Sequence, residues 1–252
     1  MTLTVDSEPM IAYLLASVRI VAWLLLVPPF SSRAVPPHAR ALLALGLAFA
    51  VAPGLSRADM PVGAAALAGT VLQEALVGAS MGFTTYLVFA AVQAAGDLID
   101  VFGGFSVAAA FDPMSANMNS VFGRLYQMLA TMLLFVSDAH LLVVGGLLRT
   151  FERLPVGSTV DLFDFTESVS TAFSLFFVSA VQIALPLVGV LFVADLGLAL
   201  LTKVAPQLNA IGVMFPAKIG LTLMIVGLSF PVLPDAVERL VEYALDAMTV
   251  MS

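Results

Sequence analysis

The sequence predicts an all-α, membrane-associated protein of about six long, partly broken hydrophobic helices, followed by a C-terminal amphipathic helix. Hydrophobic residues make up 61% of the 252 residues, charged residues make up only 11%, and the mean hydropathy is +1.06. Soluble domains average about 45–50% apolar and about 25% charged residues. The apolar residues also gather in six long runs. So large an excess cannot be hidden in a water-facing globule, so the chain is of the membrane class.

The first two runs are predicted to be helices. Residues 11–27 are apolar and are preceded by acidic rather than basic residues, unlike a secretory signal peptide, so we expect a retained first helix. Residues 41–52 number only 12, too few to cross a hydrocarbon core of about 30 Å. This second helix is therefore expected to begin earlier, near Pro37, because proline suits the first turn of a helix.

The other four runs differ in length. Residues 62–95 would form roughly 50 Å of helix against a hydrocarbon core of about 30 Å, and residues 165–201 form a still longer run. Pro186 lies near the middle of that longer run, so a kink or a break is expected there. The remaining runs are residues 121–148 and 211–233. Runs too long for a simple crossing require tilt, breakage or extension beyond the lipid.

Six ionisable side chains lie inside these apolar runs. An unpaired charge at a helix centre carries an insertion penalty of about 2.5–3.5 kcal/mol, so each must face protein, water or another charge. The six could form an ion or proton path, or they could form structural ion pairs between helices. Because they share no common spacing, we favour ion pairs, with Arg19 and Glu74 as the obvious partners. The six are Arg19, Glu74, Asp138, His140, Asp195 and Lys218.

Two further patterns indicate packing rather than chemistry. Gly78 and Gly82 have the G-x-x-x-G spacing that lets helix backbones approach closely in lipid. The C-terminal segment has amphipathic spacing, and its polar face is acidic. Anionic lipid would repel that face, which leaves two possibilities, docking on protein or a solvated tail. Its apolar face holds Leu240, Val241, Ala244, Leu245 and Met248, and its polar face holds Glu238, Glu242 and Asp246.

The composition argues against several function classes. The chain has no cysteine, which excludes disulfides and thiolate chemistry, and its net charge of −7 argues against nucleic acid as a partner. His38 and His140 are the only histidines; Asp138 and His140 are two residues apart, so they would point to different faces of a helix. Common nucleotide-binding, zinc-protease and hydrolase motifs are missing. We therefore expect no enzyme activity, no cofactor and no metal.

Lys and Arg divide equally between alternate loops, so charge does not set the orientation of the chain in the membrane.

Residues 96–119 form the most polar interior stretch, yet they are rich in phenylalanine and methionine. Gly103-Gly104 and Asp112-Pro113 would interrupt a helix there. The stretch could be an interfacial helix, or it could fold into a cavity, where irregular backbone is tolerated at membrane depth. The residues alone favour the interfacial helix. The apolar side chains are Phe102, Phe105, Phe111, Met114 and Met118.

Several local strings resemble the FliR/SctT family of type III export gate subunits, and the similarity runs in order over essentially the whole chain. The most specific string is Ala-Pro-Gln-Leu-Asn at residues 205–209 followed by Phe215-Pro216. Two positions depart from the family pattern: Ala139, where members often have glycine, and Phe102, where members often have glutamine. The motif residues are Pro206, Gln207, Asn209 and Pro216, and the other resembling stretches are residues 19–30, 73–83 (QEALVGASMGF), 110–119 (AFDPMSANMN), 137–157 and 183–220.

The resemblance implies a non-enzymatic subunit of a bacterial secretion channel in the inner membrane, within the flagellar basal body. One copy would assemble with about five FliP-like and about four FliQ-like subunits, and FlhB- and FlhA-like proteins would be further partners. Unfolded flagellar proteins would pass through the resulting pore. The single subunit, residues 1–252, would consist of a FliP-like half, residues 1–157, and a FliQ-like half, residues 158–252, built of long bent hairpins.

By the same resemblance, residues 100–119 match the loop that plugs the closed pore, which reverses the preference for an interfacial helix. The plug contacts would be Phe105, Phe111, Met114 and Met118. Flagellar use is favoured over use in an injectisome by Asp112-Pro113 and by the Leu-Pro-Val-Gly string at residues 154–157. A competing class is a small secondary transporter that uses Glu74, Asp138 and Lys218 for ion coupling.

Overall fold

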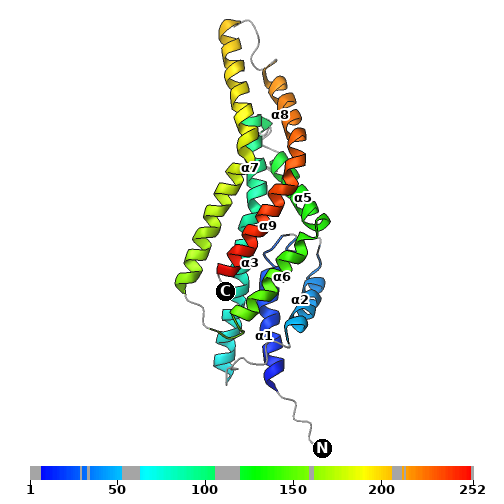
Figure 1. Cartoon of the computed structure of the whole chain (residues 1–252), viewed down its shortest axis with the longest axis vertical. Coiled ribbons are helices and arrows are strands. Elements are labelled where there is room, and N and C mark those ends of the chain that lie inside the picture. The colour runs from blue at the N-terminus through cyan, green and yellow to red at the C-terminus, as the bar shows by residue number, and fades with distance from the viewer. Residues whose placement is uncertain are drawn as a thin grey trace, which may run out of the picture. The chain divides into compact units, whose positions relative to one another are not determined.

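The computed structural model describes residues 7–28, 30–32, 35–52, 63–105, 120–158, 162–205, 212 and 214–250 (Figure 1). Every regular element in these ranges is helical, which confirms the predicted all-α class. In this part of the chain, three helices are long and apolar enough to cross a membrane, or up to four if a bent helix pair is counted as one span.

The first three helices follow the predicted runs. Helix α1 spans Ser7–Leu24 and packs against α2, which spans Pro37–Val51 (Figure 1). Helix α2 begins at Pro37, as predicted, because proline occupies the first turn, where its missing N–H has no helical partner. Helix α3 is one continuous helix of 40 residues, Ala64–Gly103, roughly 60 Å long at 1.5 Å per residue. Residues 64–95 of the third apolar run therefore lie in one unbroken helix.

The fourth run is not one helix. It is divided into α5, Val121–Val136, and α6, Ala139–Arg153, which meet at a bend of 77°. Asp138 lies at this corner with a φ of 56°, a left-handed conformation that a short polar side chain tolerates better than most. The sequence gives residues 121–148 as one apolar run, and in the structure the helix breaks within this run, where the chain has Ser137-Asp138.

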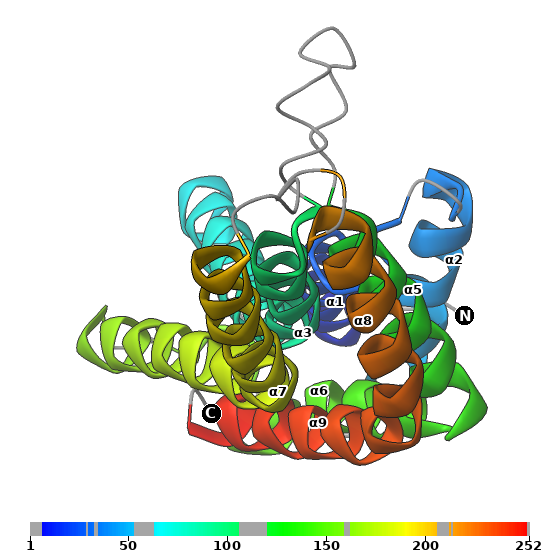
Figure 2. The same ribbon diagram turned by 90° about the horizontal axis from the view of Figure 1, so that it is seen from above.

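Helix α7 spans Leu162–Val204 and passes through Pro186 without ending. Of the kink and the break expected at Pro186, the break does not occur. Helix α8, Phe215–Ser229, passes directly through a short 3₁₀ turn, η3, Phe230–Val232, into α9, Leu233–Val250 (Figure 2). The predicted amphipathic C-terminal helix is α9, whose Leu240, Val241, Ala244 and Met248 side chains are buried and whose Glu238, Glu242 and Asp246 side chains are exposed.

The contacts divide the chain into two compact units. The first draws on Met1–Val88, Asp138–Ser174 and Val241–Ser252, and the second draws on Phe89–Ser137 and Leu175–Leu240. Each unit is therefore assembled from segments that are far apart in the sequence. The division into a FliP-like half, residues 1–157, and a FliQ-like half, residues 158–252, stays a prediction.

Several residues named in the sequence analysis lie outside the described ranges. Phe105 and Pro216 are described, and the second of these lies exposed in the first turn of α8. The ones outside are Phe111, Met114, Met118, Pro206, Gln207 and Asn209.

Candidate functional site

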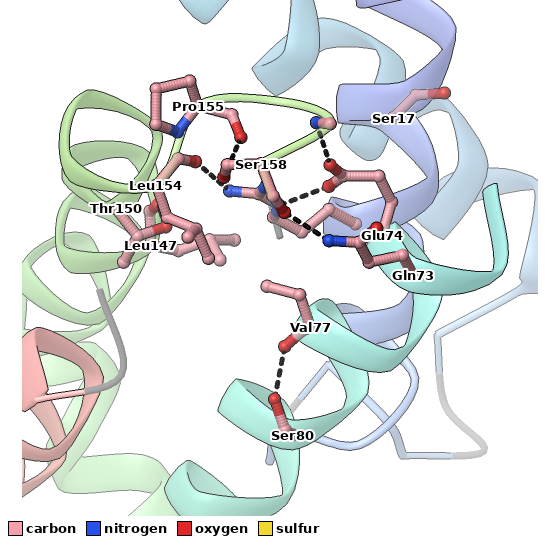
Figure 3. Close-up of polar contacts among 12 residues, drawn as sticks. Ser17, Gln73, Glu74, Val77, Ser80, Leu147, Thr150, Leu154, Pro155 and Ser158 are labelled. Atoms are coloured by element: carbon pink, nitrogen blue, oxygen red, sulfur yellow. Dashed lines mark hydrogen bonds and ion pairs between the residues drawn. The ribbon is translucent and has the colours of Figure 1, made fainter. Parts of the chain in front are cut away.

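The first compact unit contains a buried ion pair that joins α1 to α3. The Nε atom of Arg19 lies 2.6 Å from Oε2 of Glu74, and both side chains are only 1% exposed (Figure 3). The sequence predicts these two residues as partners, because burial of either charge alone is costly. The structure places them in direct contact.

The same two side chains also hold the loop between α6 and α7, residues 154–158, which we call the α6–α7 loop. Arg19 donates a hydrogen bond of 2.8 Å from Nη1 to the carbonyl oxygen of Leu154. The backbone N–H of Gly157 donates a bond of 2.8 Å to Oε1 of Glu74. The neighbouring Gln73 donates from Nε2 to the carbonyl oxygen of Ser158 (Figure 3). Three side chains from two helices therefore fasten one loop.

The environment of Arg19 favours its positive charge. Leu154 directly follows the last residue of α6, so its carbonyl lies at the negative end of that helix dipole. The guanidinium carbon also lies 4.4 Å from the ring centroid of Phe151, a geometry in which a cation is attracted to the ring face. The buried cation is thus offset by a carboxylate, a helix C-terminus and an aromatic face.

Glycine makes the close approach of α1 and α3 possible. A Cβ atom on Gly78 would lie 2.1 Å from the carbonyl oxygen of Arg19, and one on Gly82 would lie 3.0 Å from that of Trp23. The predicted G-x-x-x-G pair therefore sits where α3 contacts the backbone of α1, next to the ion pair. A third glycine, Gly157, has a φ of 84°, a conformation that favours glycine and that aims its N–H at Glu74.

This arrangement can hold two helices and a loop in one geometry. A buried ion pair of this kind adds little net stability to the fold, since the desolvation of both ions offsets their attraction. It does make the geometry specific, because any displacement leaves a charge or a backbone group without a partner. We therefore interpret the cluster as structural.

The other intramembrane charges predicted from the sequence lie elsewhere. Lys218 of α8 pairs with Asp195 of α7 in the second unit, with Nζ 2.7 Å and 2.8 Å from the two carboxylate oxygens. Asp138 is exposed at the corner between α5 and α6, rather than inside a helix. His140 is half-buried on α6.

Sequence reasoning missed the pairing of Asp195 with Lys218 and the contribution of the α6–α7 loop. The first could have been found, because the midpoint of the two residue numbers is 206.5, which lies in the connection between the fifth and sixth runs. Residues equally distant from the connection of an antiparallel helix pair lie opposite each other. The second carried no signal in side-chain chemistry, since Leu154 and Gly157 contribute backbone atoms.

Phe105 lies just beyond the end of α3 and contacts α5. Its ring is edge-on to that of Phe122, with centroids 4.8 Å apart and an interplanar angle of 74°. The backbone changes direction immediately before it, at Gly104, which has a φ of 85°. The first of the four predicted plug residues is therefore packed within the second unit.

The chain is a membrane-type helical protein with long apolar helices. A buried ion pair links two of these helices to each other and to a loop. The model of the family described as bacterial export proteins, family 1, matches residues 10–244. The chain belongs to this family.

Individual relatives support this membership. The chain is 35% identical over 191 residues to the flagellar biosynthetic protein FliR of Escherichia coli K12, covering 76% of this chain and 73% of that protein. It is 30% identical to FliR of Pectobacterium carotovorum, covering 92% and 88% of the two chains. It is also 29% identical to the secretion system apparatus protein SsaT of Salmonella typhimurium, covering 65% and 63%.

Proposed function

We propose that this chain is a core subunit of a flagellar type III protein export gate. It would form, together with FliP-like and FliQ-like subunits, the inner-membrane pore through which unfolded flagellar proteins leave the cell. FlhB- and FlhA-like proteins would act on the same pore. The observation that carries the proposal is the family match over residues 10–244, together with relatives named for flagellar biosynthesis.

The distribution of apolar surface supports an assembled subunit. The most apolar window of α3 is 67% buried within the chain, whereas the corresponding window of α7 is 28% buried and that of α8 and α9 is 17% buried. Apolar helix surface that is left exposed to this extent marks contact with lipid or with other proteins. We infer that α7 and α8 are covered by neighbouring subunits and by lipid in the assembled gate.

The charged residues argue against the competing transporter function. Ion coupling requires groups that can bind and release an ion during transport. Glu74 is instead bound to Arg19 and to the N–H of Gly157, and Lys218 is bound to Asp195. Both side chains serve the packing of this chain, so the export gate remains the function that we propose.

Within this function, we propose that residues 100–119 include the plug of the closed pore, with Phe105, Phe111, Met114 and Met118 as its apolar contacts. Deleting residues 104–118 should then make the assembled complex leaky to small ions, because the apolar side chains that exclude water are gone. The measurement is ion conductance of the purified complex in a lipid bilayer, compared with the complex that contains the unaltered chain.

A milder variant separates the loss of apolar side chains from the loss of chain length. Changing Phe111, Met114 and Met118 to serine keeps the loop length and leaves the contact of Phe105 with Phe122 intact. This variant should also leak. Unchanged conductance in both the deletion and the serine variant would contradict the plug assignment.

A further inference from the structure

A buried carboxylate joins the two segments that border residues 106–119. Asp100, in the last turn of α3, is 4% exposed. It accepts hydrogen bonds from the hydroxyl of Ser120 and from the backbone N–H of Phe122, the latter at 3.2 Å to Oδ2 and 3.3 Å to Oδ1. We call Asp100, Ser120 and Phe122 the flank anchor.

The flank anchor caps the N-terminus of α5. Ser120 is the N-cap residue of α5, and its Oγ accepts a bond of 2.8 Å from the N–H of Gly123. Asp100 supplies a negative charge at the positive end of the α5 dipole, where free N–H groups stabilise an anion. Its buried charge is therefore stabilised by donors from residues on the far side of the 106–119 segment.

Packing reinforces the anchor on both sides. A Cβ atom on Gly96 of α3 would lie 2.4 Å from the carbonyl oxygen of Phe122, so the two backbones are in contact there. Phe105 lies edge-on against the ring of Phe122. A Cβ atom on Gly103 would lie 2.7 Å from the side chain of Thr222 on α8, so the end of α3 is enclosed as well.

We propose that Asp100 is a positioning residue for the pore plug: it holds the two ends of the plug segment together at the start of α5. This inference rests on the proposed function, since it assigns a role to residues that support the proposed plug. Phe105 and Ser120 are the described residues on either side of residues 106–119, and both are bound to the same residue, Phe122, directly or through Asp100. With the anchor broken, the ends separate and the plug loses its position while keeping every one of its own side chains.

The first test is ion conductance of the purified complex carrying Asp100→Ala or Ser120→Ala. Each should raise the resting leak by about tenfold or more, because each removes the charge-assisted hydrogen bond between Asp100 and Ser120, and a tenfold change corresponds to about 1.4 kcal/mol. Asp97→Ala is the matched control. Asp97 lies one turn earlier on the same helix and carries the same charge, but its Oδ1 has no hydrogen-bond partner among the described residues. It should leave the leak unchanged.

The second test replaces the anchor by a covalent bond. The chain has no cysteine, so the double variant Asp100→Cys/Ser120→Cys can form only this disulfide within the chain. The reduced form should leak like Asp100→Ala, and the oxidised form should return to the leak of the unaltered chain. This reversal on one preparation excludes general misfolding as the cause of the leak.

Two results would overturn the proposal: equal leak in the Asp97 and Asp100 variants, or failure of the two cysteines to cross-link in the assembled complex. Failure of the proposed plug itself is distinguishable. The cysteines would then cross-link as expected, while the variant with serine at positions 111, 114 and 118 would not leak.

Discussion

Replacement of Arg19 by methionine should destabilise the first compact unit by about 3–5 kcal/mol, the usual penalty for removing one member of a buried ion pair. Methionine fills much of the arginine volume. The loss of stability is therefore caused by the missing charge rather than by a cavity. Glu74, which is 1% exposed, would keep its hydrogen bond from Gly157 but lose its counter-ion. The measurement is the thermal unfolding midpoint and the accumulated amount of the purified complex.

The double variant Arg19→Met/Glu74→Gln provides the control. Both variants lose the hydrogen bond to the Leu154 carbonyl, and glutamine can still accept the N–H of Gly157. The double variant therefore differs from the single one in having no buried unpaired charge. It should recover most of the lost stability, whereas equal damage in the two variants would contradict the structural ion pair.

The pair of variants that the structure suggests differs from the pair that the sequence alone suggests. From the sequence, replacing both Arg19 and Glu74 by apolar residues is predicted to spare assembly largely. The structure adds that these side chains also satisfy the backbone of the α6–α7 loop. Two apolar residues would leave that buried carbonyl and N–H without partners, at about 1–3 kcal/mol each.

Gly78→Ala should destabilise the chain by about 3 kcal/mol or more, the upper end of the range for overpacking. The new methyl group would lie 2.1 Å from a backbone oxygen and 2.9 Å from a backbone carbon of Arg19, neither of which can move aside as a flexible side chain can. The helices would have to separate, and the ion pair beside them would stretch. Thermal unfolding of the purified complex measures the loss.

Substitutions at two other glycines of α3 provide comparisons for the effect of Gly78→Ala. Gly82→Ala should have an intermediate effect, since its nearest contact would be 3.0 Å. Gly69→Ala places its methyl group where nothing lies within 4 Å, so it should be neutral or stabilising by up to about 1 kcal/mol through helix propensity. An effect of Gly78→Ala no larger than that of Gly69→Ala would show that α1 and α3 do not pack through this contact.

The helical class and the order of the helices could be predicted because apolar runs of this length leave few alternatives. The start of α2 at Pro37 could also be predicted, since an apolar run too short to span the bilayer needs extension and proline marks a first turn. The pairing of Arg19 with Glu74 could be proposed because a buried charge requires a partner. In each case a strong local constraint acts on side chains that the sequence makes visible.

Other features depend on backbone groups, which the sequence does not distinguish. The corner at Asp138 lies within one predicted apolar run, and the two polar residues Ser137 and Asp138, the second in a left-handed conformation, divide α5 from α6. The bonds from Arg19 to Leu154 and from Gly157 to Glu74 likewise use backbone atoms. The flank anchor combines both limits, because Asp100 binds a hydroxyl and an N–H that lie at least 20 residues further along the chain.

We propose that this chain is one subunit of a hetero-oligomeric export gate. The decisive experiment is purification of the tagged chain from its native membrane in mild detergent, followed by native mass measurement. We expect a single copy with about five FliP-like and about four FliQ-like chains, an arrangement that differs from the closed symmetric homo-oligomers common among soluble proteins. Recovery of the chain alone, or as a symmetric oligomer of itself, would contradict this proposal.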